Sequence, residues 1–306
     1  MGSIMCNVPT CFCFLFLFSH RKVLKMLNDR PHKITLAAAA KIKKARGVGD
    51  LLTMPSANSK LAKSSGFFNC GITLAQGNIS GHEVCHGRGN CFRFESNGET
   101  FTPCLGNQGR AEHLPAIANY RIARTRFLFD HPQEFAQCLF AELSAVDRKA
   151  QRLGVRVAFR ANILSDLDWA RIAPWLFESF PNWVFYDYTK IKSRYRQFLA
   201  GELPDNYDLT MSYSERLSDD FCKDILSAGG TLAVPFAVDS VDLLPASFLG
   251  SPVVDAVSSD LRFLDQPGTV AGLISKTPKA KESARIFNRV VIESGFFVSA
   301  SDSRCR

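Results

Sequence analysis

Apolar runs and helical stretches alternate along most of this chain, and this alternation constrains its fold more than any other feature. The runs are rich in β-branched and aromatic residues, whereas the segments between them repeat their apolar residues at helical spacing. Strands that alternate with helices predict an α/β protein with a parallel sheet. The expected strands are residues 66–75, 155–163, 183–189, 207–213, 231–238, 253–257 and 269–274.

The number of these units favours one architecture. About seven strands in succession are too many for one half of a Rossmann sheet, and no Gly-x-Gly-x-x-Gly motif follows any of them. We therefore expect a complete or incomplete (βα) TIM-like barrel with a Cys-rich loop after the first strand, and a flat doubly wound sheet is the alternative. The expected helices are residues 35–46, 116–127, 132–153, 166–180, 193–200, 218–228 and 280–292.

The net charge of +8 belongs to the N-terminal part of the chain. Residues 1–46 carry nine basic side chains and one acidic one, and the remaining residues carry equal numbers of each. Attraction to nucleic acid is therefore expected through residues 21–46 only.

Four segments of different character divide the chain. Residues 1–25 contain a short apolar run followed by a basic cluster, which fits neither a membrane span nor a secretory signal. We interpret them as an upstream extension outside the fold, with a short membrane-surface anchor as the alternative. Residues 26–50 form a basic arm with a short helix, residues 51–295 a single domain, and residues 296–306 a polar tail.

Cysteine and histidine gather after the first expected strand. Cys85, Cys91 and Cys104 lie in a Gly-rich loop, and His82 and His86 stand beside the first of them. Three thiolates and one imidazole can close a zinc site, and three cysteines can hold an iron–sulfur cluster with one open iron. The spacing matches no standard zinc motif, so three unligated cysteines are the alternative. The uneven cysteine spacing also indicates a reducing compartment, and we expect the cytoplasm.

Polar residues stand at the ends of the later strands, where a (βα) barrel places its working groups. We take Asp166, Asp187 and Lys190 as candidate catalytic residues, and Ser212 and Asp260 as candidate substrate-binding residues. Helix capping is the alternative for Asp166. Asp187 lies inside an aromatic strand, where we expect either an inward carboxylate paired with Lys190 or Arg160, or a carboxylate turned towards solvent.

Several short motifs resemble the phage gene-product-88 family. They are the Asn58–Leu61 segment, Gly81–Cys85 with the later Cys91 and Cys104, and Phe185–Lys190, and the match extends over residues 51–276. The resemblance implies a phage, prophage or plasmid origin, and it adds Asn58, Ser59 and Lys60 as candidate substrate-binding residues.

A looser resemblance is to radical-SAM enzymes, which place three cluster cysteines after the first strand of a partial barrel. It implies an iron–sulfur cluster with S-adenosylmethionine, although the spacing of Cys85, Cys91 and Cys104 departs from the usual motif. Two functions therefore remain open: a metal- or cluster-dependent enzyme, and a zinc-stapled nucleic-acid-binding or replication accessory protein that uses the basic arm.

Overall fold

The computed structural model describes residues 27–57, 61, 66–87, 89–91, 94–96, 99–101, 104, 114–275 and 289–306. The expected extension at residues 1–25 and the candidate residues Asn58, Ser59 and Lys60 lie outside the described residues. In the described part, the central element is a nine-stranded sheet in the order β1-β2-β5-β6-β7-β8-β11-β10-β9. Its strands are β1 (Leu52–Thr53), β2 (Phe67–Ile72), β5 (Arg156–Arg160), β6 (Val184–Thr189), β7 (Tyr207–Ser212), β8 (Leu232–Phe236), β9 (Ser247–Phe248), β10 (Ser251–Asp255) and β11 (Val270–Ile274).

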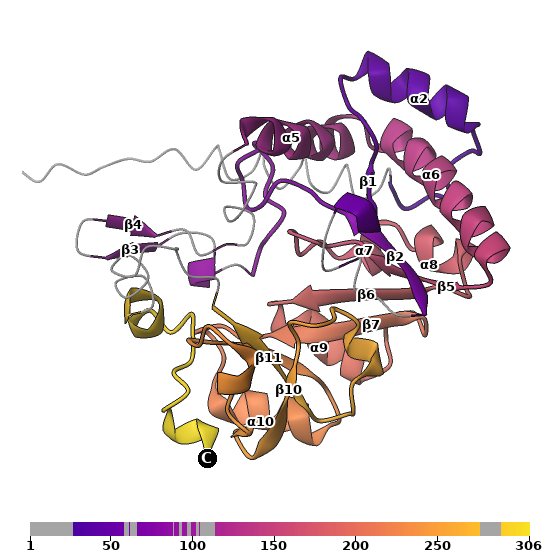
Figure 1. Ribbon diagram of the computed structural model, residues 1–306. Coiled ribbons are helices and arrows are strands. Elements are labelled where there is room, and N and C mark those ends of the chain that lie inside the picture. The colour runs from indigo at the N-terminus through magenta and orange to yellow at the C-terminus, as the bar shows by residue number, and fades with distance from the viewer. Residues whose placement is uncertain are drawn as a thin grey trace, which may run out of the picture.

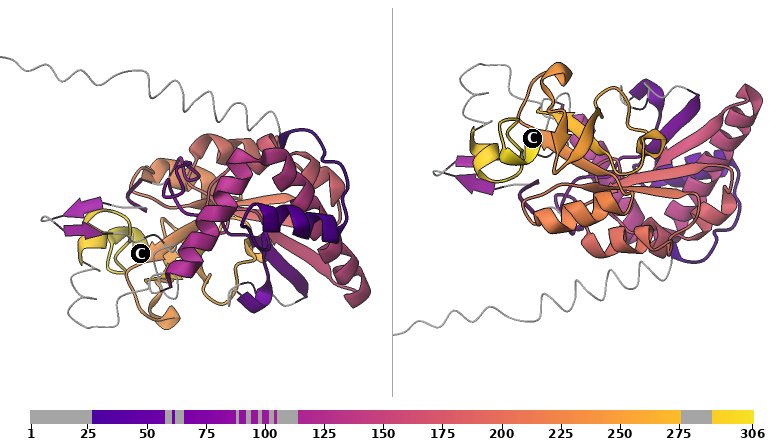
Figure 2. Two further views of the ribbon diagram at one scale, coloured as in Figure 1. Left: turned by 90° about the horizontal axis from the view of Figure 1, so that it is seen from above. Right: turned by 90° about the horizontal axis from the view of Figure 1, so that it is seen from below.

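The predicted α/β class and parallel sheet are confirmed. Every pair of neighbours from β2 to β10 is parallel, and only the short end strands β1 and β9 run antiparallel (Figure 1). The strands follow chain order except that β11 lies between β8 and β10. A separate hairpin pairs β3 (Phe94–Ser96) with β4 (Glu99–Phe101), and it lies beside the C-terminal segment in all views (Figures 1 and 2).

The helices follow the sequence signals, with one exception. The described helices are α2 (Leu36–Ala45), α5 (Pro115–Asp130), α6 (Pro132–Leu153), α7 (Trp169–Ile172), α8 (Trp175–Ser179), α9 (Lys192–Leu199) and α10 (Asp219–Ser227). Thr35 and Ser218 cap α2 and α10 through their hydroxyl oxygens, and Gly154 ends α6 at φ 65°. The helix expected at residues 280–292 falls largely outside the described residues.

The single helix predicted over residues 166–180 is wrong. The chain forms two short helices there, α7 and α8, which are separated at Ala173 and Pro174. Proline has no N–H to donate and disfavours helical dihedrals in the residue before it. Ala173 accordingly takes φ −147° and ψ 61°, which ends α7.

The two faces of the sheet are covered differently. Large apolar side chains such as Phe159, Phe185 and Leu209 belong to the main core, which also contains the buried residues of the helices. Figure 1 shows these helices on one side of the sheet. We call it the helix-covered face. The opposite face carries small residues such as Ala158, Ala233 and Ala271, and Leu261, Phe263 and Ala256 pack against it. Side-chain alternation along each strand therefore divides the site residues between two different environments.

The basic arm is attached to the body of the protein. Lys43 of α2 is buried and forms ion pairs with Glu142 of α6 and with Asp50. The same Glu142 carboxylate accepts the backbone N–H groups of Leu51 (3.0 Å) and Leu52 (3.1 Å). Burial disfavours the charge of Lys43, but the hydrogen bonds to Glu142 and Asp50 outweigh it and raise the pKa. One carboxylate thus fastens both the arm and the start of the sheet.

The C-terminal segment, expected as a polar tail, is packed on the domain. Phe296, Phe297 and Val298 are buried, and Val298 bridges to Phe236 of β8. Arg304 forms ion pairs with Asp302 and Asp219. In the described part of the chain, no helix combines the length and apolar character that crossing a bilayer requires.

Replacing Glu142 by Gln is expected to lower the free energy of unfolding by about 3 kcal/mol, because one partner of a buried ion pair is removed while the lysine remains. Urea unfolding followed by circular dichroism measures the change. Glu134→Gln on the same helix is the matched control, because its pair with Arg46 is exposed and should contribute little. Equal effects of the two substitutions would contradict the role assigned to Glu142.

Candidate functional site

The three cysteines predicted as metal ligands, Cys85, Cys91 and Cys104, line one cavity at the carboxyl edge of the sheet. The cavity has a volume of about 140 Å³. Residues at and just beyond the carboxyl ends of β5, β6 and β7, together with the loop after β2, supply its walls. The cavity therefore lies where parallel α/β sheets usually hold their ligands. Its lining consists of Gln76, Gly77, Cys85, Cys91, Cys104, Arg160, Asn162, Ile163, Leu164, Ser165, Asp166, Tyr188, Lys190 and Ser212. We call it the thiol cavity.

The Cys loop is held against the sheet by backbone contacts. The carbonyl of Val84 accepts the N–H of Asp166 at 2.7 Å, and the Cys85 thiol donates to the carbonyl of Leu164 at 3.4 Å. A Cβ on Gly87 would lie 3.0 Å from that of Lys190, a tight contact, so a glycine there lets the loop approach the end of β6 without displacing Lys190. These contacts position Cys85 directly above the β5 loop.

The thiols differ in their electrostatic surroundings. A hydrogen bond with Cys104 lowers the pKa of Cys91 to about 7 against the effect of burial, and the charge of Lys190 acts in the same direction. Burial raises the pKa of Cys85 to about 12. The charge of Cys104 also acts on Arg121 of α5, so a second cation lies near the thiols. Cys91 is therefore more readily ionised than Cys85 when no metal is bound.

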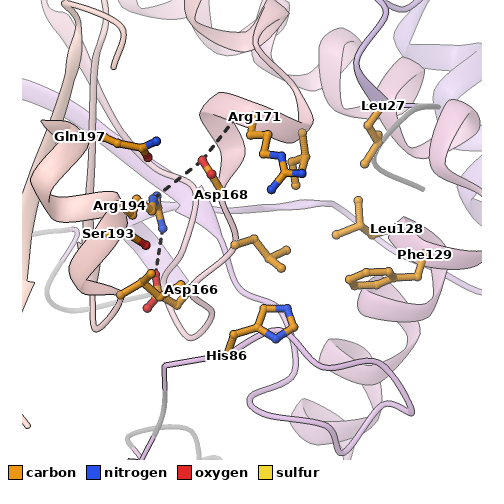
Figure 3. A pocket seen from close by; sticks show the side chains of 13 residues that line it. Leu27, His86, Leu128, Phe129, Asp166, Asp168, Arg171, Ser193, Arg194 and Gln197 are labelled. Carbon is orange, nitrogen blue, oxygen red and sulfur yellow. Dashed lines mark hydrogen bonds and ion pairs between the residues drawn. The ribbon is translucent and has the colours of Figure 1, made fainter. Parts of the chain in front are cut away.

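The two histidines face away from the thiol cavity. His82 bonds to Asp130 at 3.1 Å and stacks on Phe129 with ring centroids 4.6 Å apart. His86 lines a second, larger cavity (Figure 3). Among the described residues, no three His, Cys, Asp or Glu side chains already stand at metal-ligand geometry. The structure thus brings the cysteines together and leaves both predicted imidazole ligands elsewhere.

Asp166 is buried in a network that joins two elements. Its carboxylate accepts the guanidinium of Arg194 at 2.8 Å and the backbone N–H of Lys190, also at 2.8 Å. Burial raises the pKa of Asp166, although Arg194 and the Lys190 N–H favour the charged form. It is not a helix cap, since Asp168 caps α7. Asp166 lines both cavities and holds the loop after β5 to the turn before α9.

Asp187 is buried on the helix-covered face. It accepts the backbone N–H of Asn162 at 2.7 Å, the amide of Asn162 at 2.9 Å and the hydroxyl of Tyr207 at 3.0 Å. The solvent-facing alternative is wrong, because the side chain is 1% exposed. The expected inward burial is confirmed, but the partners are Asn162 and Tyr207, whereas Lys190 and Arg160 hydrogen-bond to other groups. Burial raises the pKa of Asp187 to about 6, although the charges of Arg194 and Arg160 oppose this. Its contacts fix the shape of the β5 loop.

The remaining candidates lie in or next to the thiol cavity. Lys190 lines it and donates from Nζ to the carbonyl of Tyr213 at 2.6 Å, and Ser212 lines it from the end of β7. Asp260 lies behind the lining, where it pairs with Arg160 at 2.9 Å. The Arg160 guanidinium also lies 4.5 Å from the ring centroid of Tyr188.

Several lining residues were not proposed as site residues from the sequence. The sequence indicated Arg160 only as a partner of Asp187, and no sequence signal selected Asn162 or Tyr188. The same is true of Arg121, which lies near the thiols but does not line the cavity. Strand alternation places Arg160 and Tyr188 on the same face as Ser212, which is the one signal that could have selected them. No local pattern links Arg121, on a helix, to the cysteines.

One family model matches a part of the chain that includes every residue lining the thiol cavity. The family model described as Gene product 88 matches residues 37–289 of the chain. No curated protein and no solved structure matches it significantly.

Replacing Asp187 by Asn is expected to lower the free energy of unfolding by about 1–3 kcal/mol, because an amide NH₂ would face groups that themselves donate. An unfolded aspartate has a pKa of about 3.9, below the value of about 6 in the folded protein. The native state then holds the proton more tightly, so the contribution of Asp187 to stability falls as pH rises between these values.

The substitution should therefore cost more at pH 4.5 than at pH 7, as measured by urea unfolding at both values. Asp205→Asn, at an exposed position, is the control and should show neither effect. A cost that does not change with pH would argue against the raised pKa.

In the metal-free protein, Cys91 is expected to react with iodoacetamide faster than Cys85 at pH 7.5, because more of it is thiolate. Cys104→Ala should move the midpoint of the Cys91 reaction upward from about pH 7 by removing the hydrogen bond. Peptide mass spectrometry across a pH series gives both rates. Cys305→Ala should leave the profile unchanged, and a Cys104→Ala profile identical to the wild type would show that the thiols do not interact.

Proposed function

The chain belongs to the gene product 88 family, and from this premise we propose that it carries a thiolate-bound metal centre at the carboxyl edge of its sheet. Cys85, Cys91 and Cys104 are the proposed ligands. The single observation that carries the proposal is that these three side chains, distant in sequence, line one small cavity. The family match includes all three. The resemblance stated for this family implies a phage or mobile-element origin.

The donor set favours an iron–sulfur cluster over zinc. Structural zinc usually takes four protein ligands, and neither His82 nor His86 faces the thiol cavity in the described structure. Three thiolates with one open position suit a cluster that leaves one iron for another ligand. Among the described residues these thiols do not stand at metal-ligand geometry, so binding of the metal would require the three cysteine side chains to come closer together.

Positive charge around the cavity supports thiolate binding. Lys190 acts on Cys91, Arg121 lies near Cys104, and Arg160 lines the cavity wall. Nearby cations favour deprotonated thiols, which are the form that binds metals. Lys190 is held in place on both sides, since its N–H donates to Asp166 and its Nζ donates to Tyr213.

We further infer that the sheet curves as a partial (βα) barrel with the site at its mouth. Five successive parallel strands follow chain order, and small side chains line the face opposite the helices. The looser resemblance to radical-SAM enzymes would then make S-adenosylmethionine the ligand of the open iron, which such a cluster reduces. The residues of this chain that would meet a substrate are Arg160, Lys190 and Ser212, with Asp260 orienting Arg160.

A nucleic-acid-binding role through residues 21–46 has less support. Lys43 and Arg46, two of the basic residues on which it depends, form ion pairs with Glu142 and Glu134 of the body. Their charges are therefore largely compensated before any nucleic acid binds.

Anaerobic purification followed by iron, sulfide and zinc assays and a visible spectrum tests the proposal. We expect iron and sulfide with a broad visible absorbance, and a loss of most bound iron in each of Cys85→Ser, Cys91→Ser and Cys104→Ser. Cys305→Ser is the matched control, because Cys305 lies outside the thiol cavity. His82→Ala should retain the metal.

Three results would argue against this function. Stoichiometric zinc that is lost in His82→Ala or His86→Ala would support a closed zinc site instead. Iron retained in all three cysteine variants would place the metal elsewhere. A protein that stays free of iron and zinc after anaerobic reconstitution would remove the metal centre altogether.

A further inference from the structure

A second cavity adjoins the thiol cavity and shares Asp166 with it. Its volume is about 540 Å³, within the range of about 300–1,000 Å³ that is usual for small-molecule sites. Cys85 and His86 are consecutive in sequence, yet Cys85 lines the thiol cavity and His86 lines this one. The proposed metal centre does not require this space.

The lining of the second cavity is divided into an apolar and a polar side. Figure 3 shows Leu27, Leu128 and Phe129 on one side and Asp168, Ser193 and Gln197 on the other. Arg171 lies between the two groups, and its guanidinium points into the space. Phe129 is held by its stacking on His82. A ligand that fills this cavity would meet both hydrocarbon and hydrogen-bonding groups.

The carboxylates on the polar side are compensated within the protein. Asp166 pairs with Arg194 at 2.8 Å. Asp168 accepts the backbone N–H of Arg171 at 3.3 Å and lies 4.0 Å from the Arg194 guanidinium. Arg194 is occupied by these groups and by Tyr207. Arg194 therefore neutralises Asp166 and partly screens Asp168, and the backbone N–H of Arg171 also stabilises the Asp168 carboxylate.

Arg171 is the cation that this arrangement leaves available. It is exposed, and among the described residues no hydrogen bond or ion pair engages its guanidinium. An arginine in this state presents paired N–H donors that match a carboxylate or a phosphate. Ser193 adds a hydroxyl at the start of α9, a helix with no side-chain cap. The Arg171 guanidinium and the Ser193 hydroxyl are both hydrogen-bond donors, so they fit a ligand that carries acceptor oxygens.

We propose that this cavity binds a small amphipathic anion. Its carboxylate or phosphate group bonds to Arg171, and its apolar or aromatic part packs against Leu128 and Phe129. The site is separate from the proposed metal centre. Among the described residues, the Asp166 wall, the loop at residues 85–86 and the segment at residues 190–191 connect the two.

Isothermal titration calorimetry of the full chain with four probes tests the proposal. The probes are 1-naphthyl phosphate, 1-naphthoate, 1-naphthol and inorganic phosphate. We expect one of the two naphthyl anions to bind at least about tenfold more tightly than 1-naphthol and than inorganic phosphate, because only the anions satisfy both sides of the cavity. The tighter of the two identifies the preferred oxyanion.

Substitutions locate the binding site. Arg171→Ala should weaken the preferred anion by about tenfold or more, Arg171→Lys should restore part of the affinity, and neither should change the affinity for 1-naphthol. Arg196→Ala on α9 is the matched control, because Arg196 is exposed and does not line the cavity. Cys85→Ser should bind the anion normally, so this result does not depend on the metal centre.

Three outcomes would overturn the proposal. They are no measurable binding of either naphthyl anion at millimolar concentration, equal binding of 1-naphthol, and unchanged affinity in Arg171→Ala protein whose circular dichroism spectrum matches the wild type.

Discussion

The buried carboxylates Asp166 and Asp187 are the constraint on which the shape of the functional edge depends. Taking a carboxylate out of water costs several kcal/mol unless donors replace the solvent. Asp187 obtains its donors from Asn162 and Tyr207, and Asp166 obtains its own from Arg194 and the Lys190 backbone. The oxygen of the Asn162 side chain in turn accepts bonds from Ser165, Leu167 and Trp169. The loop after β5 can satisfy these groups in few conformations, and the lining of both cavities follows from that.

The hydrogen-bond network around Asp187 lies on the helix-covered face, whereas the groups best placed to meet a ligand come from other parts of the structure. Arg160 and Ser212 project from the opposite face, and the cysteines come from the loop above the strand ends. Asp187 therefore influences the thiol cavity indirectly. Its hydrogen bonds fix the position of Asn162, and Asn162 forms part of the cavity wall. This division between groups that hold a site and groups that line it is common in α/β proteins, where rigid strands support variable loops.

The fold was largely predictable from the sequence, and the site only partly. Strands buried on both faces appear as continuous apolar runs, which is why β5, β6, β7 and β8 were located closely. The position of β11 between β8 and β10 was not, because strand order depends on long-range packing that no local pattern encodes. The partners of Asp187 were not predicted for a related reason: alternation can bury a carboxylate but does not identify the loop residue, here Asn162, that approaches it. The two histidines failed as ligands because sequence proximity to Cys85 does not fix side-chain direction in a loop.

The direction of the chain at residues 85–86 also explains how two sites can share one loop. The bonds from Asp166 to Val84 and from Cys85 to Leu164 hold the loop against the β5 segment, and the next side chain, His86, lines the other cavity. Asp166 forms the wall between them and is tied to Lys190 on one side and to Arg194 on the other. A change in either cavity that moved Asp166 would leave the buried Arg194 guanidinium and the Lys190 backbone N–H short of a partner, which is costly. The wall is therefore expected to stay rigid, so that each cavity can be filled without remodelling the other.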